Sequence, residues 1–194
     1  AERRAGEVRG LVLVDAAAAG TRVGSFERLQ AHVVNFLQLP VIHQIADATF
    51  GQLLDTVTVD MTDGKAFHPQ PIASAHRHRV LAINMTKGNL EAYGGEELAA
   101  NGVIERVDKQ LGTIEVPAVV IQGTSDELIE PIHGRKLAAA LPHASLRLVR
   151  GGHMAPYTHP AAIAEAVQSL AGPASRATGQ AAALTPRRPA RIAA

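Results

Sequence analysis

Three short aliphatic runs constrain the fold of this chain more than any other feature of its sequence. They span about Leu11–Val14, Ala118–Gln122 and Ser145–Val149, and each ends at a polar or glycine-containing turn. The first two are almost entirely apolar, which is typical of strands covered on both faces in a parallel sheet. Helix patterns with Pro131 and Pro160 in their first turns follow the last two runs. This alternation predicts an α/β fold in which helices pack on a parallel sheet.

The composition argues against several classes of function. The 194 residues suit one domain with a sizeable core, and the absence of cysteine excludes a disulfide framework, a thiol nucleophile and a Cys-based metal site. A net charge of +1 and few aromatic residues argue against a nucleic-acid partner. No apolar run is long enough to span a membrane, and the first ten residues do not resemble a signal peptide. We therefore expect a cytoplasmic protein with no membrane partner, no cofactor and no metal.

The chain divides into a core, an insertion and a tail. Residues 1–24 and 113–172 carry the strand and helix patterns of the core, whereas residues 25–112 are mostly helical and lack a clear strand. Residues 173–194 contain four arginines and no acid among alanines, prolines and small polar residues, so we expect a disordered basic tail.

Within the insertion, four segments have distinct patterns. Residues 25–39 and 41–57 read as amphipathic helices, separated by Pro40. Residues 61–71 read as a loop, and residues 72–88 as a helix that Gly88 ends. The remaining stretch to residue 112 contains several glycines and predicts a broken helix.

Asp126 and His153 lie just past the second and third predicted strands. Because the carboxyl ends of parallel strands meet at one edge, and the connection between them is right-handed, we expect both loops at the same edge of the sheet. A carboxylate there can hold one nitrogen of the imidazole, while the other nitrogen takes a proton from a nucleophile. Gly151 and Gly152 would allow the backbone before the histidine to turn sharply.

These motifs resemble the C-terminal half of an α/β-hydrolase. The match runs from "VPAVVIQGTSDELIEP" through "GRKLAAALPHASLRLVRGGHMAPYTHPAAIAEAV", and "VRGLVLVDAA" is similar to the strand that precedes the lid of that family. The resemblance implies a partial α/β-hydrolase parallel sheet with an inserted, mostly helical lid at residues 25–112. It also implies that Asp126 is the catalytic acid and His153 the catalytic base.

The nucleophile that completes this triad is not found in the sequence. The family places it on a strand-to-helix elbow, usually G-x-S-x-G, upstream of the predicted strand at Leu11. None of the serines has the required setting between a strand and a helix; they are Ser25, Ser74, Ser125, Ser145, Ser169 and Ser175. An H-G segment for an oxyanion donor is also missing, which favours a chain that lacks the N-terminal half of the fold.

Other polar residues have plainer interpretations. Asp15 lies at a strand end from which some relatives supply an alternative catalytic acid. We favour the interpretation that Asp15 caps the segment that follows it. Ser125 is best explained as a turn residue, because it lies on the acid loop. His76 and His78 diverge on a helix and have no third ligand at a useful spacing, which argues against a metal site.

The resemblance implies a serine-esterase-like hydrolase of a small-molecule ester or related bond. Since no elbow is present, we expect the chain alone to be inactive, as a fragment that supplies the acid and histidine. The alternative is a truncated relative that no longer catalyses, or an interaction module. In either case the strand at Leu11–Val14 would be an exposed apolar edge, so we expect marginal stability or self-association through it.

Overall fold

The computed structural model describes residues 5–22, 24, 28, 29, 31, 32, 36, 64–84 and 87–171. Most of the predicted helices at 25–39 and 41–57, and the predicted tail at 173–194, lie outside these residues.

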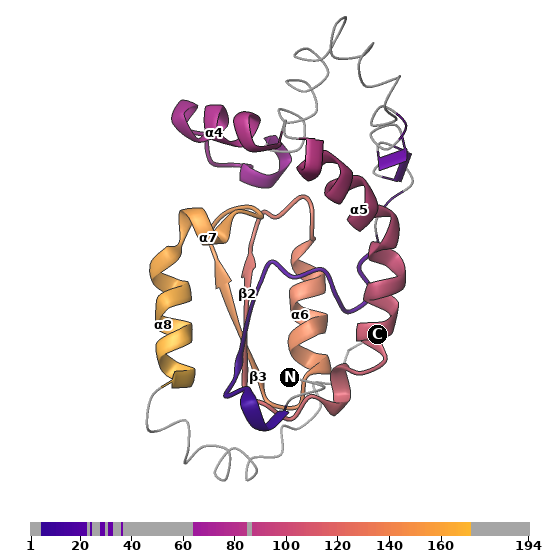
Figure 1. Cartoon of the computed structure of the whole chain (residues 1–194). Helices are drawn as coiled ribbons and strands as arrows, with labels where there is room; N and C mark the ends of the chain where they lie inside the picture. Colours follow the sequence, from indigo (N-terminus) through magenta and orange to yellow (C-terminus); the bar gives the residue numbers. More distant parts are fainter. Residues whose placement is uncertain are drawn as a thin grey trace, which may run out of the picture.

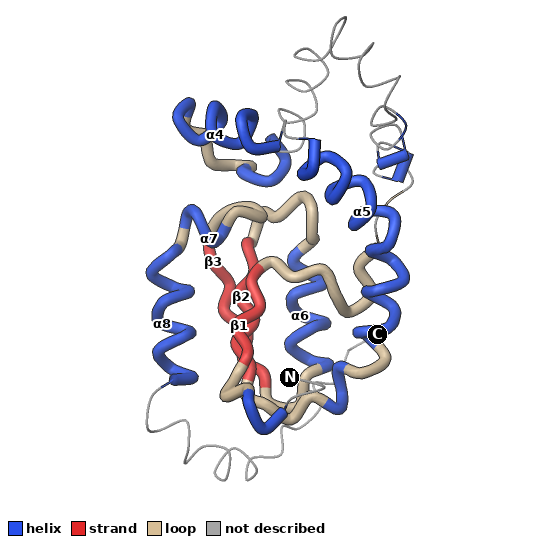
Figure 2. The backbone as a smooth tube through the Cα atoms, viewed as in Figure 1, coloured by secondary structure: helices blue, strands red, loops and turns tan. Residues whose placement is uncertain are grey.

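A sheet of three parallel strands forms the centre of the described structure. The strands are β1 (Leu11–Val14), β2 (Ala118–Gly123) and β3 (Ala144–Val149), in the order β1-β2-β3. Every residue of β2 is buried, which explains why its sequence is a continuous apolar run rather than an alternating one. The predicted parallel sheet and its three strands are therefore confirmed (Figure 2).

Helices cover both faces of this sheet. Helix α6 (Pro131–Ala140) lies on one face and α8 (Pro160–Ala171) on the other (Figure 1). On the α6 side the core contains Val120, Leu137 and Leu141, and on the α8 side it contains Val119, Ile121 and Ala166. The alternation of side chains along β2 thus feeds two separate apolar layers.

The helical spacing of Ile163, Val167 and Leu170 predicts that they form one face of α8. Ile163 and Leu170 pack on the sheet as expected, but Val167 is 49% exposed and Ala166 is fully buried. The small side chain of Ala166 occupies the point at which the helix lies against β2 and β1.

The helical insertion is more regular than its glycines predict. Helix α4 spans Ser74–Asn84, and α5 runs without interruption over Lys87–Asp108. The predictions that Gly88 ends a helix and that the following stretch is broken are therefore wrong. Each internal glycine costs roughly 1 kcal/mol relative to alanine, and the many strong helix formers around these glycines outweigh that cost.

Shorter helical turns occur near the loops. The 3-10 helices are Ala5–Glu7 and Leu111–Thr113, and α7 spans Ala155–Thr158. Gly64–Phe67 also forms a helical turn, where the sequence predicted only loop.

Asp108, at the end of α5, ties the insertion to the core. Its Oδ1 accepts the N–H of Ala19 at 2.6 Å, and its Oδ2 accepts the N–H of Gly20 at 2.8 Å. Both of those residues have positive φ angles, 55° and 86°, which turn their N–H groups toward one carboxylate. The connection after β1 is thereby fixed to the far end of α5.

Exposed glycines in α5 provide a test of its helical continuity. A Cβ at Gly102 would meet no atom within 4 Å, so Gly102→Ala should gain helix propensity without a steric cost. We expect the free energy of unfolding to rise by about 0.5–1 kcal/mol, measured by chemical denaturation. Gly123→Ala, whose Cβ would collide with the backbone of Gly152, is the opposite control and should destabilise. A loss of stability at Gly102 would contradict a continuous α5.

Candidate active site

Asp126 is held by its own loop at the carboxyl end of β2. Its side chain is buried, and Oδ1 accepts the N–H groups of Leu128 and Ile129, each at 2.9 Å. These two bonds form a local turn of the kind that Asp favours. They leave the second oxygen, Oδ2, to face away from the turn.

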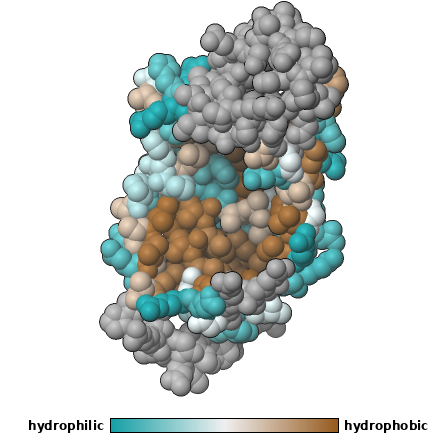
Figure 3. All heavy atoms as spheres, in the orientation of Figure 1, coloured by the Kyte–Doolittle hydropathy of each residue, from teal (hydrophilic) through white to brown (hydrophobic). Residues whose placement is uncertain are grey.

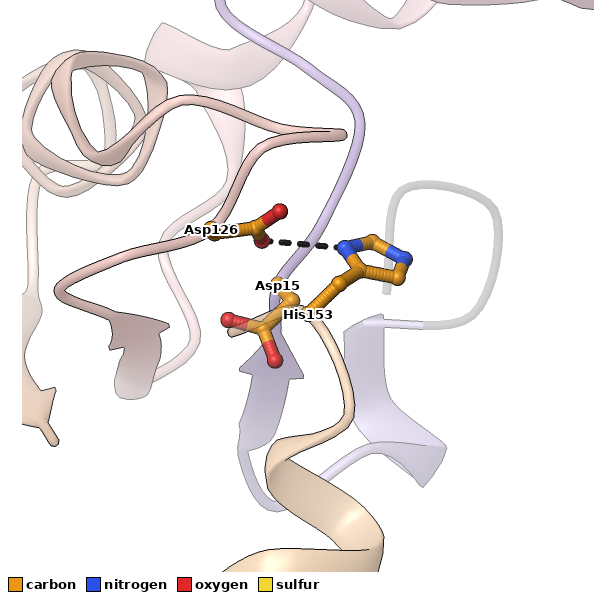
Figure 4. A group of neighbouring side chains, drawn as sticks. All are labelled: Asp15, Asp126 and His153. Carbon is orange, nitrogen blue, oxygen red and sulfur yellow. Dashed lines mark hydrogen bonds and ion pairs between the residues drawn. The ribbon is translucent and has the colours of Figure 1, made fainter. Parts of the chain in front are cut away.

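His153 lies opposite Oδ2 of Asp126. Its Nδ1 is 2.9 Å from Oδ2 of Asp126, and the two residues come from loops that follow neighbouring strands (Figure 4). The acid is fully buried, whereas 29% of the histidine side chain is exposed. Because a carboxylate accepts here, Nδ1 carries the proton. Within the described residues, Nε2 has no hydrogen-bond partner, and Figure 4 shows this nitrogen on the side of the ring away from Asp126.

Asp15 is a third member of the site that the sequence did not identify correctly. Its carboxylate is buried and accepts the N–H of Gly123 at 2.8 Å and the N–H of Ala155 at 3.3 Å. The interpretation of Asp15 as a cap for the following segment is therefore wrong. It joins the end of β1 to the end of β2 and to the start of α7, and its place at a strand end was the only sequence signal.

Gln122 was also missed. It is fully buried at the end of β2, and its Nε2 donates to Asp15 Oδ1 at 3.2 Å, to Asp126 Oδ2 at 3.0 Å and to the carbonyl of Ile129 at 3.0 Å. Its Oε1 is buried without a partner among the described residues. A polar residue in an otherwise apolar strand was the available signal. The amide bonds to both carboxylates and offsets part of the repulsion between them.

Three glycines allow the two loops to approach each other. A Cβ at Gly123 would collide with the carbonyl of Gly152 and lie 2.6 Å from the carbonyl of Gly151. Gly151 has a φ of 146°, a conformation that favours glycine. The N–H of Ser125 then donates to the carbonyl of Gly151 at 2.8 Å and joins the acid loop to the histidine loop.

The electrostatics of the site follow from this geometry. Burial alone would raise the pKa of Asp126, but the bonds from His153 and from the N–H groups of Ile129 and Leu128 outweigh it and lower that pKa. Burial would likewise lower the pKa of His153, but its hydrogen bond and ion pairing with Asp126, together with the charge of Asp15, raise it. The pKa of Asp15 is raised, chiefly by burial and also by the charge of Asp126. The site thus favours an ion pair between Asp126 and His153.

The same three residues could be mistaken for a metal site, because one ligand atom from each lies within 4.8 Å of the others. Their carboxylate oxygens, however, already accept N–H groups. Asp126 takes two backbone donors on one oxygen and two side chains on the other, and Asp15 takes three donors in all. A cation would have to displace these donors, so the cluster is better suited to holding a proton.

The remaining sequence candidates do not join the site. The backbone N–H of Ser125 donates to the carbonyl of Gly151, consistent with a turn residue. His76 packs against Phe67 and Tyr157, and His78 is exposed.

The Asp126–His153 pair makes a prediction about stability and pH. The lowered pKa of Asp126 means that its contribution is present above pH 3.8 and is lost as pH falls through the folded-state value. The raised pKa of His153 means that its contribution is present below pH 6.5 and is lost as pH rises through the folded-state value. Asp126→Asn should therefore destabilise most at about pH 5, by about 1–3 kcal/mol, and less at about pH 9.

Denaturant unfolding at both pH values measures this difference. Glu115→Gln is the matched control, since it removes an exposed carboxylate 3.0 Å from His143, an interaction worth about 0–1 kcal/mol. If Asp126→Asn lowers the free energy of unfolding only slightly at both pH values, the result would contradict a buried ion pair.

Comparisons with known proteins support the architecture. No protein-family model and no curated protein matches the sequence. Solved structures do match: an enol-lactonase from Burkholderia xenovorans (23% identity, TM-score 0.57), a haloalkane dehalogenase from Bradyrhizobium elkani (15%, 0.55) and an α/β hydrolase from a deep-sea metagenome library (18%, 0.57). These matches cover 88%, 91% and 83% of this chain.

The chain spans 59%, 64% and 55% of the length of those structures, respectively. At such identities the similarity concerns the fold. Three parallel strands flanked by α6 and α8, with an acid and a histidine on adjacent loops, agree with it. The chain therefore has the α/β-hydrolase fold and spans part of it.

Proposed function

We propose that this chain provides the acid and the base of a hydrolase that acts on an ester or a related bond in a small molecule. The observation that carries the proposal is the 2.9 Å bond between Asp126 and Nδ1 of His153, with Nε2 left for a reacting group. The structural neighbours include a lactonase and a dehalogenase, which is consistent with small-molecule hydrolysis.

The proposed mechanism follows from the two nitrogens of one ring. Nε2 of His153 takes a proton from an attacking hydroxyl or water, and the resulting imidazolium is stabilised by the carboxylate of Asp126. The same proton then passes to the leaving oxygen as the bond to the carbonyl breaks. A Ser or Asp nucleophile, supplied by sequence outside the described residues or by a complementing chain, would complete the triad.

We also propose that residues 25–112 act as a lid, with residues 1–24 and 113–172 as the core. In Figure 1, α4 lies beyond the carboxyl ends of the strands, on the side of α7. The rings of His76 on α4 and Tyr157 on α7 are 4.9 Å apart.

The described residues contain no helix long and apolar enough to cross a membrane.

An activated ester tests the proposed chemistry, because an accessible imidazole reacts with such an ester even where no separate nucleophile is present. The missing elbow predicts no efficient hydrolysis by the chain alone, so we expect only slow cleavage of p-nitrophenyl acetate through His153. His153→Ala should abolish the protein-dependent rate. Asp126→Asn should lower it toward the background rate, because the ring then loses the carboxylate that holds its proton on Nδ1. Release of p-nitrophenol measures the rate.

His143→Ala is the matched control, because His143 also has a carboxylate partner, Glu115, at 3.0 Å, but in an exposed position. It should leave the rate unchanged. If the wild-type chain and His153→Ala react equally, the proposed general base is wrong and the alternative of a non-catalytic interaction module is favoured.

We further propose that the outer edge of β1 pairs with the same strand of a second copy. Because alternate residues of a parallel strand bond to one neighbour, the N–H and C=O groups of Val12 and Val14 point away from β2. Figure 3 shows a hydrophobic area between α6 and α8, where Figure 1 places β1. The opposite edge carries Arg147, 3.9 Å from Glu165, whereas β1 has no charge or proline to discourage pairing.

Proline substitution separates the two edges. Val12→Pro removes an outward N–H while leaving the bonds to β2, so we expect it to shift a concentration-dependent dimer to monomer in sedimentation velocity. Leu148→Pro makes the same change on the β3 edge and should leave association unchanged. A wild-type chain that stays monomeric at high concentration would overturn this proposal.

A further inference from the structure

We propose that the segment Gly64–Gln70 is a clamp on the histidine loop, and that Gln70 is a positioning residue for His153. This inference rests on the proposed function. The segment belongs by sequence to the predicted lid, yet it bonds to the residues on either side of His153. Its His68 also lies 3.3 Å from Glu127 on the acid loop. The clamp would make the orientation of the His153 ring depend on the position of the insertion.

Gln70 holds the backbone before His153 with both ends of its amide. Nε2 donates to the carbonyl of Arg150 at 3.1 Å, and Oε1 accepts the N–H of Gly152 at 3.3 Å. The amide lies so close to Gly151 that a Cβ there would collide with Nε2 of Gln70. The two bonds therefore bracket a glycine pair that has little conformational preference of its own.

Ala66 holds the backbone after His153. Its carbonyl accepts the N–H of Met154 at 3.1 Å, and a Cβ at Gly152 would come within 2.9 Å of the same carbonyl and collide with that of His68. His153 is thus fixed on both sides by a single segment.

An aromatic cluster anchors the clamp. The buried ring of Phe67 lies 4.9 Å from the ring of His76 and 5.4 Å from that of Tyr157, both in edge-on arrangements. Tyr157 follows His153 on α7, so the clamp packs on the same loop that it bonds. Edge-to-face aromatic pairs of this kind prefer defined orientations.

The two halves of the acid–base pair are therefore fixed in different ways. Asp126 is oriented by bonds to Leu128 and Ile129 within its own loop. The histidine loop instead receives its bonds from distant segments: from Gln70 and Ala66, from Ser125 at Gly151 and from Asp15 at Ala155. Loss of the clamp should therefore disturb the imidazole more than the carboxylate.

The test compares Gln70→Ala and Gln70→Glu with Gln168→Ala, which removes the same side chain from an exposed position on α8. The pKa of His153 is measured by NMR titration of its ring, and ester hydrolysis is followed in parallel. We expect Gln70→Ala to shift that pKa toward its value in Asp126→Asn and to lower the rate of p-nitrophenyl acetate cleavage on the order of 10- to 100-fold. Gln70→Glu retains the acceptor for Gly152 but loses the donor to Arg150, and should give a smaller pKa shift.

The outcomes separate this inference from the proposed function. If Gln70→Ala behaves like Gln168→Ala while Asp126→Asn still shifts the pKa of His153, Gln70 does not position the ring and the inference is wrong. If Asp126→Asn also leaves the pKa of His153 unchanged, the proposed pairing of Asp126 with His153 is wrong. Should Gln70→Ala not fold, the Gln70→Glu titration decides, and a wild-type pKa in that variant overturns the inference.

Discussion

The central strand β2 is the constraint on which the rest of the structure depends. It pairs with β1 on one side and β3 on the other, in parallel and with Val120 opposite both Leu13 and Leu146. Parallel pairing brings the carboxyl ends of three strands to one rim, and the loops that follow them carry Asp15, Asp126 and His153. The site is thus a consequence of the register of an apolar sheet.

Burial is what gives this rim its chemistry. The carboxylates of Asp15 and Asp126 repel each other. Hydrogen bonds from backbone N–H groups and from the amide of Gln122 offset part of this repulsion. Asp126 is stabilised as an anion, whereas the pKa of Asp15 is raised. Only Asp126 faces the imidazole with a hydrogen bond, so one acid orients the base and the other holds the loops together.

The sequence was sufficient to predict the sheet, the two flanking helices and the Asp126–His153 pair, because continuous apolar runs and prolines at helix starts are local signals. It was not sufficient to predict the site's supports. Asp15 bonds to Gln122, Gly123 and Ala155, all more than 100 residues away. Gln70 lies in a segment with only loop character by sequence. The continuity of α5 through its glycines was also missed, since propensity rules weigh each residue separately.

The most direct test of the account is the proton on Nδ1 of His153. In the chain labelled with ¹⁵N, NMR should detect a strongly deshielded proton that is bonded to this nitrogen and protected from solvent by the buried carboxylate of Asp126. We expect the signal in the wild-type protein and its loss in Asp126→Asn. A wild-type His153 whose Nδ1 carries no such proton, or whose signal is the same in Asp126→Asn, would contradict the central claim that the sheet brings these two residues together.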